Sequence, residues 1–389
     1  MPRADRTTMA LRLSLFYAAT FLAIGISMPF WPVWLHGRGL NAAEIGIVLS
    51  TGMWVRAFTN PLIAQLADRY GRPDRMVAVL AWIALASNAA YLGVDGFWPI
   101  LLIGIVAGAA YSAMFPMGDA VTMLKVRDGA VDYGHVRLWG SLAFILAATA
   151  GGRIIAGQPT ELILWLVIGC MALQLGVVYG LPRSRTAGTA RLGTPLIAIA
   201  RDRPFVAFVA VASLLQASHA VYYGFATLHW QAAGYDATVI GALWAEGVIA
   251  EVVLFAVSKR VFARMTPLSL LALAATAGVV RWAVLGSTTA LPALIAVQGL
   301  HAFTFGATHL AAMHQIARTV PAAHGATAQS FYSSFAGGLS MAAAMLVSGW
   351  LYARFGGLAF FAMAGISLAG GLAIVALVRA TGSRSGRSA

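Results

Sequence analysis

The sequence predicts an all-α integral membrane protein in which twelve transmembrane helices form two pseudo-symmetric six-helix bundles. Composition is the first observation: 60% of the 389 residues are hydrophobic, 10% are charged, and the mean hydropathy is +0.80. Soluble domains carry about one quarter charged residues. The second observation is a series of apolar runs, and the third is that basic residues gather at the ends of these runs.

Each apolar run is long enough to cross a bilayer, because a helix rises about 1.5 Å per residue and the hydrocarbon core is about 30 Å thick. Glycine, proline and charge clusters separate the runs, as in Arg69–Arg75. In chain order, the predicted spans are approximately 11–35, 44–66, 76–94, 98–122, 137–157, 161–181, 204–229, 238–258, 266–286, 291–317, 325–352 and 357–379.

The basic residues predict an orientation. If both termini lie in the cytoplasm, 21 of the 26 Lys and Arg residues are cytoplasmic and three are external, namely Arg38, Arg153 and Arg354. This asymmetry satisfies the positive-inside rule and explains the net charge of +13 without a nucleic-acid partner. The segment Met1–Arg6 leads directly into the first apolar run, so we expect a retained helix and not a signal peptide. We therefore expect a multi-pass protein of a bacterial-type inner (plasma) membrane.

The longest polar connection divides the spans six and six. Residues 182–203 contain five arginines and two prolines. This predicts an N-terminal six-helix bundle over 1–181, a cytoplasmic linker over 182–203, and a C-terminal six-helix bundle with a short basic tail over 204–389. Two six-helix halves joined in this way suggest a parallel repeat with the transport path between the halves.

Several function classes lack their motifs. The single cysteine, Cys170, provides neither a disulfide framework nor a cysteine-based metal site, and no Asp, Glu and His set has metal-ligand spacing. There is no phosphate-binding GxxxxGK[ST] loop, so we expect no cofactor and a proton gradient as the energy source. Two alternatives are a sensor without transport and a membrane enzyme with His219, His301 and His309 as acid–base groups. The enzyme is disfavoured because the loops are too short for a soluble catalytic face.

Glu251 is the most informative residue of the chain. It lies within the apolar run Ala242–Val257, where a carboxylate costs about 3 kcal/mol or more to bury in a membrane. Such residues persist where they carry protons, ions or substrate. We interpret Glu251 as the proton-coupling carboxylate, with its titration tuned by Arg281 or a histidine. The alternative is a structural ion pair with Arg281 on the next span.

Further titratable residues are candidates for proton coupling. Five residues turn an α-helix by about 140°, so Glu246 points away from Glu251 and the two do not form a simple dyad. Span 10 carries four polar or aromatic candidates on one narrow face, namely Gln298, His301, Phe305 and His309. A lone buried histidine is often structural, whereas two on one face are better candidates for a relay, because imidazole titrates near neutrality.

Spans 4 and 5 carry candidates for substrate binding. Tyr111, Phe115 and Asp119 recur at i, i+4 and i+8, so they share a helix face that suits a cavity wall. The alternative is that the rings only pack and that Asp119 pairs with Arg56 or Arg137. Arg137 opens span 5 with a planar fork of donors suited to a carboxylate or a ribose. Its alternative role is a cytoplasmic anchor.

Spans 7 and 8 extend this set. Gln216, His219 and Tyr223 form a polar stripe at i, i+3 and i+7 that we expect to face the protein interior. Trp244 shares a face of span 8 with Glu251, and its ring is able to stack on a flat solute. The complete predicted substrate-binding set is Arg137, Asp119, Tyr111, Phe115, Gln216, His219, Tyr223, Trp244, Gln298 and Phe305.

One loop carries a family resemblance. Leu66–Arg72 reads LADRYGR, which resembles the signature loop between helices 2 and 3 of the major facilitator superfamily. Ala64 replaces the first glycine of that signature, and Pro73–Asp74 interrupts its usual basic pair. The resemblance implies the major facilitator fold, with a conformational loop made of Asp68, Arg69, Gly71 and Arg72.

Six further stretches resemble the branch of this superfamily that holds 3-phenylpropionate transporters and nucleoside–proton symporters. They are 32–40, 116–119, 133–141, 250–255, 280–282 and 298–307. The resemblance covers nearly the whole chain and implies proton-coupled import of a small organic solute by alternating access. It also matches Arg137 to an arginine implicated in substrate binding in the nucleoside symporters.

The resemblance favours an aromatic carboxylate such as 3-phenylpropionate as the substrate. The alternatives are a nucleoside or sugar symporter and a proton-driven exporter of amphipathic compounds. The partners we expect are the small-molecule substrate, protons and the lipid bilayer, with no nucleic acid. We expect the protein to be a monomer.

Overall fold

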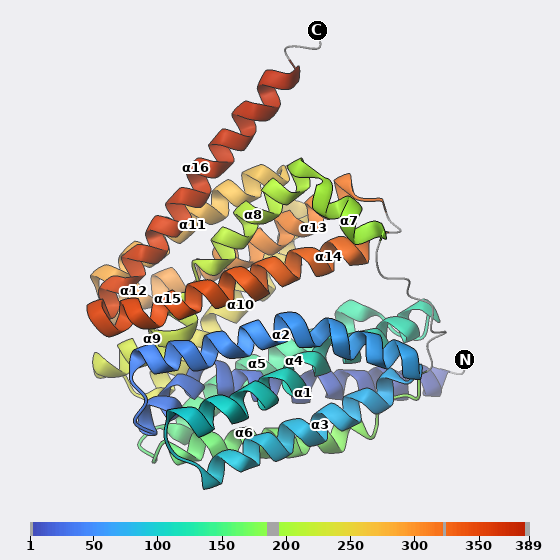
Figure 1. The fold of residues 1–389 in the computed structure, drawn as a ribbon, viewed down its shortest axis with the longest axis vertical. Helices are drawn as coiled ribbons and strands as arrows, with labels where there is room; N and C mark the ends of the chain where they lie inside the picture. The colour runs from blue at the N-terminus through green and yellow to red at the C-terminus, as the bar shows by residue number, and fades with distance from the viewer. Residues whose placement is uncertain (1–2, 185–193, 322–323, 386–389) are drawn as a thin grey trace. The chain divides into compact units, whose positions relative to one another are not determined.

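The computed structural model describes residues 3–184, 194–321 and 324–385, which are almost entirely helical (Figure 1). The first part of the chain forms α1 (Arg3–Gly37), α2 (Ala42–Tyr70), α3 (Pro73–Ala90), the 3-10 helix η1 (Tyr91–Gly93), α4 (Phe97–Arg127), α5 (Tyr133–Ile155) and α6 (Glu161–Val178). Next come α7 (Thr194–Arg201), α8 (Arg203–Ala217), α9 (Ala220–Ala232), α10 (Ala237–Val261), α11 (Pro267–Ser287) and α12 (Leu291–Gln298). The last elements are the π-helix η2 (Ala302–Ala307), α13 (Thr308–Thr319), α14 (Gly325–Ser333), the π-helix η4 (Ser334–Leu339), α15 (Ser340–Phe355), the 3-10 helix η5 (Gly356–Leu358) and α16 (Ala359–Ser385).

The described helices account for the predicted spans. In the part of the chain that the structure describes, ten helical stretches are long and apolar enough to cross a membrane. One of them, Thr327–Arg379, contains two predicted spans joined at Gly356, whose φ of +53° favours glycine. α2 is not among the ten, and polar residues such as Arg56 and Asn60 interrupt it. Counting α2 and dividing the long stretch gives the twelve predicted helices.

The chain divides into two compact units by its internal contacts. One unit contains the described residues of Met1–Ala190 together with Trp230–Ala245, and the other contains those of Arg191–His229 and Glu246–Ala389. Most of the predicted linker, residues 185–193, lies outside the described residues, as does the end of the basic tail, 386–389. The boundaries of the two predicted bundles therefore stay a prediction.

The first unit is a bundle of closely packed helices. α1 packs on α5 and α6, α3 packs on α4 and α6, and α2 packs on α4 (Figure 1). α1 and α5 lie close together at Gly25, where an added Cβ would lie 2.7 Å from the Cβ of Ala147 and 2.8 Å from the carbonyl oxygen of Phe144. Small residues at such crossings allow helices in membranes to pack closely.

The second unit contains interrupted helices. α11 packs on α16, η2 and α13, and α8 packs on η4 and α16. Predicted span 7 breaks at Ser218 and His219, between α8 and α9. Spans 10 and 11 each contain a π segment, η2 and η4, and π segments occur frequently at functional sites. η2 begins directly after His301, so the distorted turn lies beside a predicted site residue.

Candidate functional site

In the first unit, Arg137 lies against three aromatic rings. Its Cζ atom is 4.1 Å from the ring centre of Phe21, 5.5 Å from that of Phe115 and 5.8 Å from that of Tyr17. Guanidinium groups are attracted to aromatic faces at such distances. One turn away, an added Cβ at Gly140 would lie 2.8 Å from Nη1 of Arg137, so glycine leaves room for the guanidinium.

The start of α5 positions Arg137. Asp132 is the N-cap, and its carboxylate accepts the backbone N–H of His135 at 2.9 Å. That hydrogen bond lowers the pKa of Asp132, because it stabilises the charged form. The cap satisfies one of the unpaired amide groups of the first turn, so the helix that carries Arg137 starts at a defined residue.

Asp119 is held by phenols. The hydroxyl of Tyr17 donates a short hydrogen bond to Oδ1 of Asp119, and Tyr133 donates to the same oxygen at 3.4 Å. These bonds come from α1 and α5, and the charge of Arg137 also acts on Asp119. Tyr111 lies further along α4 and donates to the carbonyl of Thr20 at 2.6 Å. The structure thus brings Phe115, Asp119 and Arg137 together.

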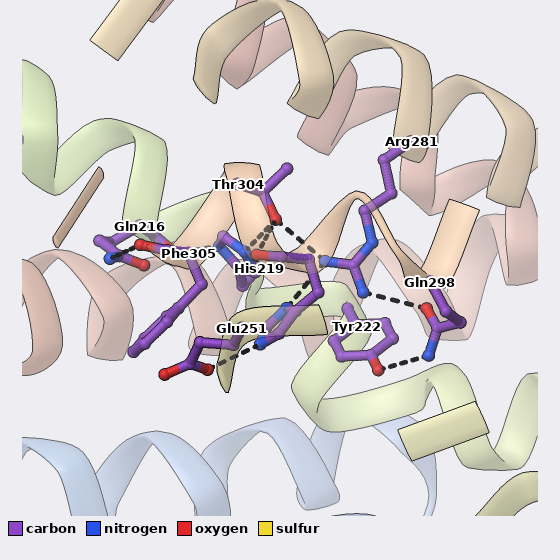
Figure 2. Close-up of polar contacts among 9 residues, drawn as sticks. Gln216, His219, Tyr222, Glu251, Arg281, Gln298, Thr304 and Phe305 are labelled. Carbon is purple, nitrogen blue, oxygen red and sulfur yellow. Dashed lines mark hydrogen bonds and ion pairs between the residues drawn. The ribbon is translucent and has the colours of Figure 1, made fainter. Parts of the chain in front are cut away.

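In the second unit, Arg281 is the centre of a buried polar network (Figure 2). Its side chain is 0% exposed, and Nη1 donates to Nδ1 of His301 and to Oγ1 of Thr304, each at 3.0 Å. Nη2 donates to Oε1 of Gln298 at 3.0 Å. The guanidinium also lies 4.5 Å from the ring centre of Tyr222. A charge buried at this depth requires such a set of partners.

His301 stands between Arg281 and Glu251. The Nε2 atom of His301 lies 3.8 Å from Oε2 of Glu251, whose side chain is 22% exposed (Figure 2). Glu251 comes from α10 and His301 from the turn before η2. An added Cβ at Gly306, in η2, would lie 3.7 Å from Cγ of Glu251, so the π segment passes close to the carboxylate. The link between Arg281 and Glu251 suggested by the sequence is therefore made through an imidazole.

His219 extends the network on the other side of Thr304. Its Nδ1 lies 3.0 Å from the carbonyl oxygen of Gln216, and its Nε2 lies 3.0 Å from Oγ1 of Thr304. The ring of Tyr223 stacks on His219 at 5.5 Å. The break between α8 and α9 places the imidazole inside the unit, where it is 0% exposed. The polar stripe predicted for span 7 thus faces the protein interior.

The amide side chains of the network are bonded within the protein. Gln298 accepts from Arg281 through Oε1 and donates from Nε2 to the hydroxyl of Tyr222 at 2.9 Å. Gln216 donates from Nε2 to the carbonyl of Phe305 at 3.5 Å and also hydrogen-bonds Tyr332. These contacts orient the two amides and leave fewer of their hydrogen-bond donors and acceptors to bind a solute.

Rings from span 10 form a column. His301 and Phe305 stack with their centres 5.5 Å apart and an interplanar angle of 12°, and Phe305 and His309 stack at 6.4 Å and 4°. The three rings therefore share one face of span 10, as the spacing predicted. His309 also contacts the ring of Tyr332 on α14 at 6.3 Å.

Two further predicted residues lie on α10. Glu246 is half-buried one and a half turns before Glu251, and it is Glu251 that approaches His301. Trp244 is buried, and it belongs to the segment Trp230–Ala245 that groups with the first unit.

Sequence reasoning missed five residues of the two sites: Tyr17, Phe21, Tyr133, Tyr222 and Thr304. Tyr17 and Phe21 are one helical turn apart on α1, and Thr304 follows His301 at i+3. This spacing was a usable signal, because residues three or four apart share a helix face.

The predicted conformational loop connects α2 and α3. Arg69 lies exposed in the last turn of α2, and Gly71 has a φ of +63°, a conformation that favours glycine. The side chain of Asp68 lies outside the described residues.

Arg72 is engaged locally in this loop. It donates from Nε and Nη2 to the carboxylate of Asp74 at 3.0 and 2.8 Å, and this hydrogen bonding raises the pKa of the Arg72 guanidinium. Asp74 also accepts a backbone hydrogen bond from Ser184, so the first residues after α6 are held to the loop.

In the described part of the chain, no group of three or more His, Cys, Asp or Glu residues is placed to hold a metal ion.

The chain is similar to transport proteins along most of its length. Residues 10–363 match the MFS_1 like family. A protein of Escherichia coli (strain K12) named "Probable 3-phenylpropionic acid transporter" is 37% identical over 92% of this chain and 94% of that protein. A maltose permease of Geobacillus stearothermophilus is 24% identical over 87% of each chain.

The fold is also found in solved structures. The crystal structure of the nucleoside transporter NupG matches with a TM-score of 0.84 over 95% of this chain and 99% of that chain, at 16% identity. At this identity the likeness concerns the fold alone. The family match and the 37% identical relative show more: the chain belongs to the MFS_1 like family and is a multi-pass secondary transporter of the major facilitator superfamily, not an enzyme.

Proposed function

We propose that this transporter is a proton-coupled symporter that imports a small aromatic carboxylate by alternating access. The observation that carries the coupling part is the position of Glu251, a partly exposed carboxylate 3.8 Å from His301, which is bonded to the buried Arg281. Arginine stays protonated in proteins, so it supplies a permanent positive charge. Glu251 is the acid whose charge changes near this permanent positive charge. Gain or loss of the Glu251 proton therefore changes the net charge of the group made of Glu251, His301 and Arg281.

The first unit supports the choice of an anionic solute. The guanidinium of Arg137 lies against three rings, and its charge also acts on the nearby carboxylate of Asp119. Its N–H donors point to a carboxylate as ligand, because the guanidinium fork matches the two oxygens. The rings of Phe21 and Phe115 add flat apolar surface suited to a phenyl group. The substrate named for the Escherichia coli relative, 3-phenylpropionic acid, combines these two features.

The second unit argues against a neutral, hydrogen-bonding solute such as a nucleoside or a sugar. Such a solute needs several amide or carboxylate partners, and the residues expected to supply them are Gln216, Gln298 and Glu246. Both amides already bond within the protein, Gln298 through both ends. The maltose permease among the relatives keeps a sugar as the second candidate. The third candidate function is export of amphipathic compounds, and measuring the direction of transport distinguishes it from import.

We also propose the arrangement in the membrane. The chain would lie in a bacterial inner (plasma) membrane as a monomer with both termini in the cytoplasm, because 21 of its 26 Lys and Arg residues then face the cytoplasm. The two bundles would comprise residues 1–181 and 204–389, joined by the linker 182–203.

Uptake into proteoliposomes tests the proposal. Purified transporter is reconstituted, and uptake of labelled 3-phenylpropionate and of labelled uridine is measured with the external pH held below, equal to and above the internal pH. We expect 3-phenylpropionate to accumulate when the outside is more acidic and uridine to be ignored. Uptake of uridine alone would contradict the substrate class. Accumulation without any dependence on the pH gradient would contradict the coupling.

A further inference from the structure

The hydroxyl of Thr304 joins the two halves of the buried network. Its Oγ1 lies 3.0 Å from Nη1 of Arg281 and 3.0 Å from Nε2 of His219, and the residue is 2% exposed (Figure 2). A third, longer contact of 3.4 Å reaches the carbonyl oxygen of His301. A single hydroxyl has one proton to donate and two lone pairs to accept with. Its partners therefore determine the direction of each bond.

The direction of the bonds follows from what each partner can do. Arginine has only donors, so Oγ1 of Thr304 accepts from Arg281. The carbonyl of Gln216 has only lone pairs, so Nδ1 of His219 carries a proton and donates to it. In the neutral ring Nε2 of His219 is then an acceptor, and Thr304 donates its one proton to this nitrogen at 3.0 Å in preference to the carbonyl oxygen of His301 at 3.4 Å. The chain of bonds runs from Arg281 through Thr304 to His219 and ends at Gln216.

The same rule assigns His301. Its Nδ1 faces Nη1 of Arg281 at 3.0 Å and must accept, so the proton of the neutral ring is on Nε2, which faces Glu251. Both histidines are thereby held as single neutral tautomers by one arginine. While these bonds persist, neither ring has a free lone pair within the network for a further proton. Glu251 is left as the group of this network that exchanges protons.

Other titratable groups lie on the helices that form the network or pack against it. From the elements packed around the network these are Tyr222 and Tyr223 on α9, Glu246 and Glu251 on α10, Arg281 on α11, His309 on α13 and Tyr332 on α14.

We propose that Thr304 is a positioning residue of the proton-coupling site: its hydroxyl keeps His219 neutral and holds Arg281 against His301, so that Glu251 alone exchanges protons. The inference rests on the proposed role of Glu251 in coupling. A serine at this position retains the hydroxyl, whereas a valine has the same branched shape without it. The pair Thr304→Ser and Thr304→Val therefore separates hydrogen bonding from packing.

A matched control lies one turn further along span 10. Thr308 is 0% exposed, and its hydroxyl donates to the backbone carbonyl of Thr304 at 2.8 Å. Thr308→Val makes the same chemical change without touching Arg281 or His219. A loss of transport that comes only from placing a valine in this part of the helix should appear in both Thr304→Val and Thr308→Val.

The first test measures proton-driven accumulation of 3-phenylpropionate against pH, together with substrate counterflow, which needs no net proton movement. We expect Thr304→Val to lower accumulation about tenfold, the size expected for one lost hydrogen bond to a charged group, and to shift its pH profile, while counterflow falls less. Thr304→Ser should restore both readouts. Accumulation and a pH profile like the wild type in Thr304→Val, or equal losses in Thr308→Val, would overturn the inference.

The second test needs no variant of Thr304. ¹⁵N spectra of histidine-labelled transporter distinguish the two neutral tautomers from the imidazolium, and His219→Gln and His301→Gln assign the signals. We expect His219 protonated on Nδ1 and His301 on Nε2 from pH 6 to 8; an imidazolium at either position would overturn the assignment. Failure of the coupling proposal looks different, because Glu251→Gln would then accumulate substrate like the wild type.

Discussion

Arg281 and His301 meet with Nη1 and Nδ1 3.0 Å apart, and this contact directs the second ring nitrogen of His301 toward Glu251. The buried cation therefore acts on the carboxylate through an imidazole. A change in the charge of Glu251 is felt first by His301 and then by Arg281, which is bonded to three other side chains. Coupling between proton binding and the shape of the second unit has a physical route in these contacts.

Arg281 should be needed for stability as well as for transport. Arg281→Lys keeps the charge, but an ammonium group cannot reproduce the planar fork that reaches His301, Thr304 and Gln298 together. Loss of two charge-assisted hydrogen bonds should cost about 3 kcal/mol. We expect a clear fall of the melting temperature of the detergent-purified protein. Arg153→Lys, at an exposed position of α5, is the control and should leave it unchanged. An unaltered melting temperature in Arg281→Lys would show that the network does not hold the unit together.

Arg137 should determine affinity for the carboxylate. Arg137→Lys retains the charge and loses the two-donor fork, so binding should weaken by about 1.5–3 kcal/mol, or roughly 10- to 100-fold in Kd. Isothermal titration with 3-phenylpropionate measures this. Arg127→Lys, exposed in the last turn of α4, is the matched control and should bind like the wild type. Equal affinities of the wild type, Arg137→Lys and Arg127→Lys would contradict a role of Arg137 in binding and favour its alternative role as a cytoplasmic anchor.

The crossing of α1 and α5 should not tolerate a methyl group. At Gly25 an added Cβ would lie 2.7 Å from Cβ of Ala147, so Gly25→Ala forces the helices apart. Overpacking of this kind costs about 1–3 kcal/mol. Gly169→Ala, on α6, adds the same methyl where nothing lies within 4 Å. Thermal unfolding of both variants checks the packing, and a melting temperature of Gly25→Ala equal to that of Gly169→Ala would contradict it.

Much of the architecture could be predicted from the sequence. Apolar length and the position of basic residues are local properties, and they sufficed for twelve helices, whereas the family resemblance came from the loop Leu66–Arg72 and six further stretches. The shared face of His301, Phe305 and His309 also followed from spacing along one helix. The prominence of Glu251 followed from the cost of its burial.

The contacts between helices could not be predicted in the same way. The bond from Tyr17 to Asp119 joins residues 102 positions apart, and a tyrosine in the first apolar run carries no sign of its partner. The break at Ser218 and the π segment after His301 depend on tertiary packing, and they place His219 and Thr304 within reach of Arg281. The sequence left open whether Arg281 or a histidine acts on Glu251, and the structure places His301 between the two.

Proton-driven accumulation by Glu251→Gln is the most direct test of the account. Glutamine keeps the shape of the side chain and cannot bind or release the proton, so net accumulation under an acid-outside gradient should vanish while substrate counterflow persists. Glu246→Gln is the matched control on the same helix and should accumulate substrate, because it is Glu251 that lies beside His301. Full accumulation by Glu251→Gln at the imposed gradient would contradict the central claim that this carboxylate couples proton movement to transport.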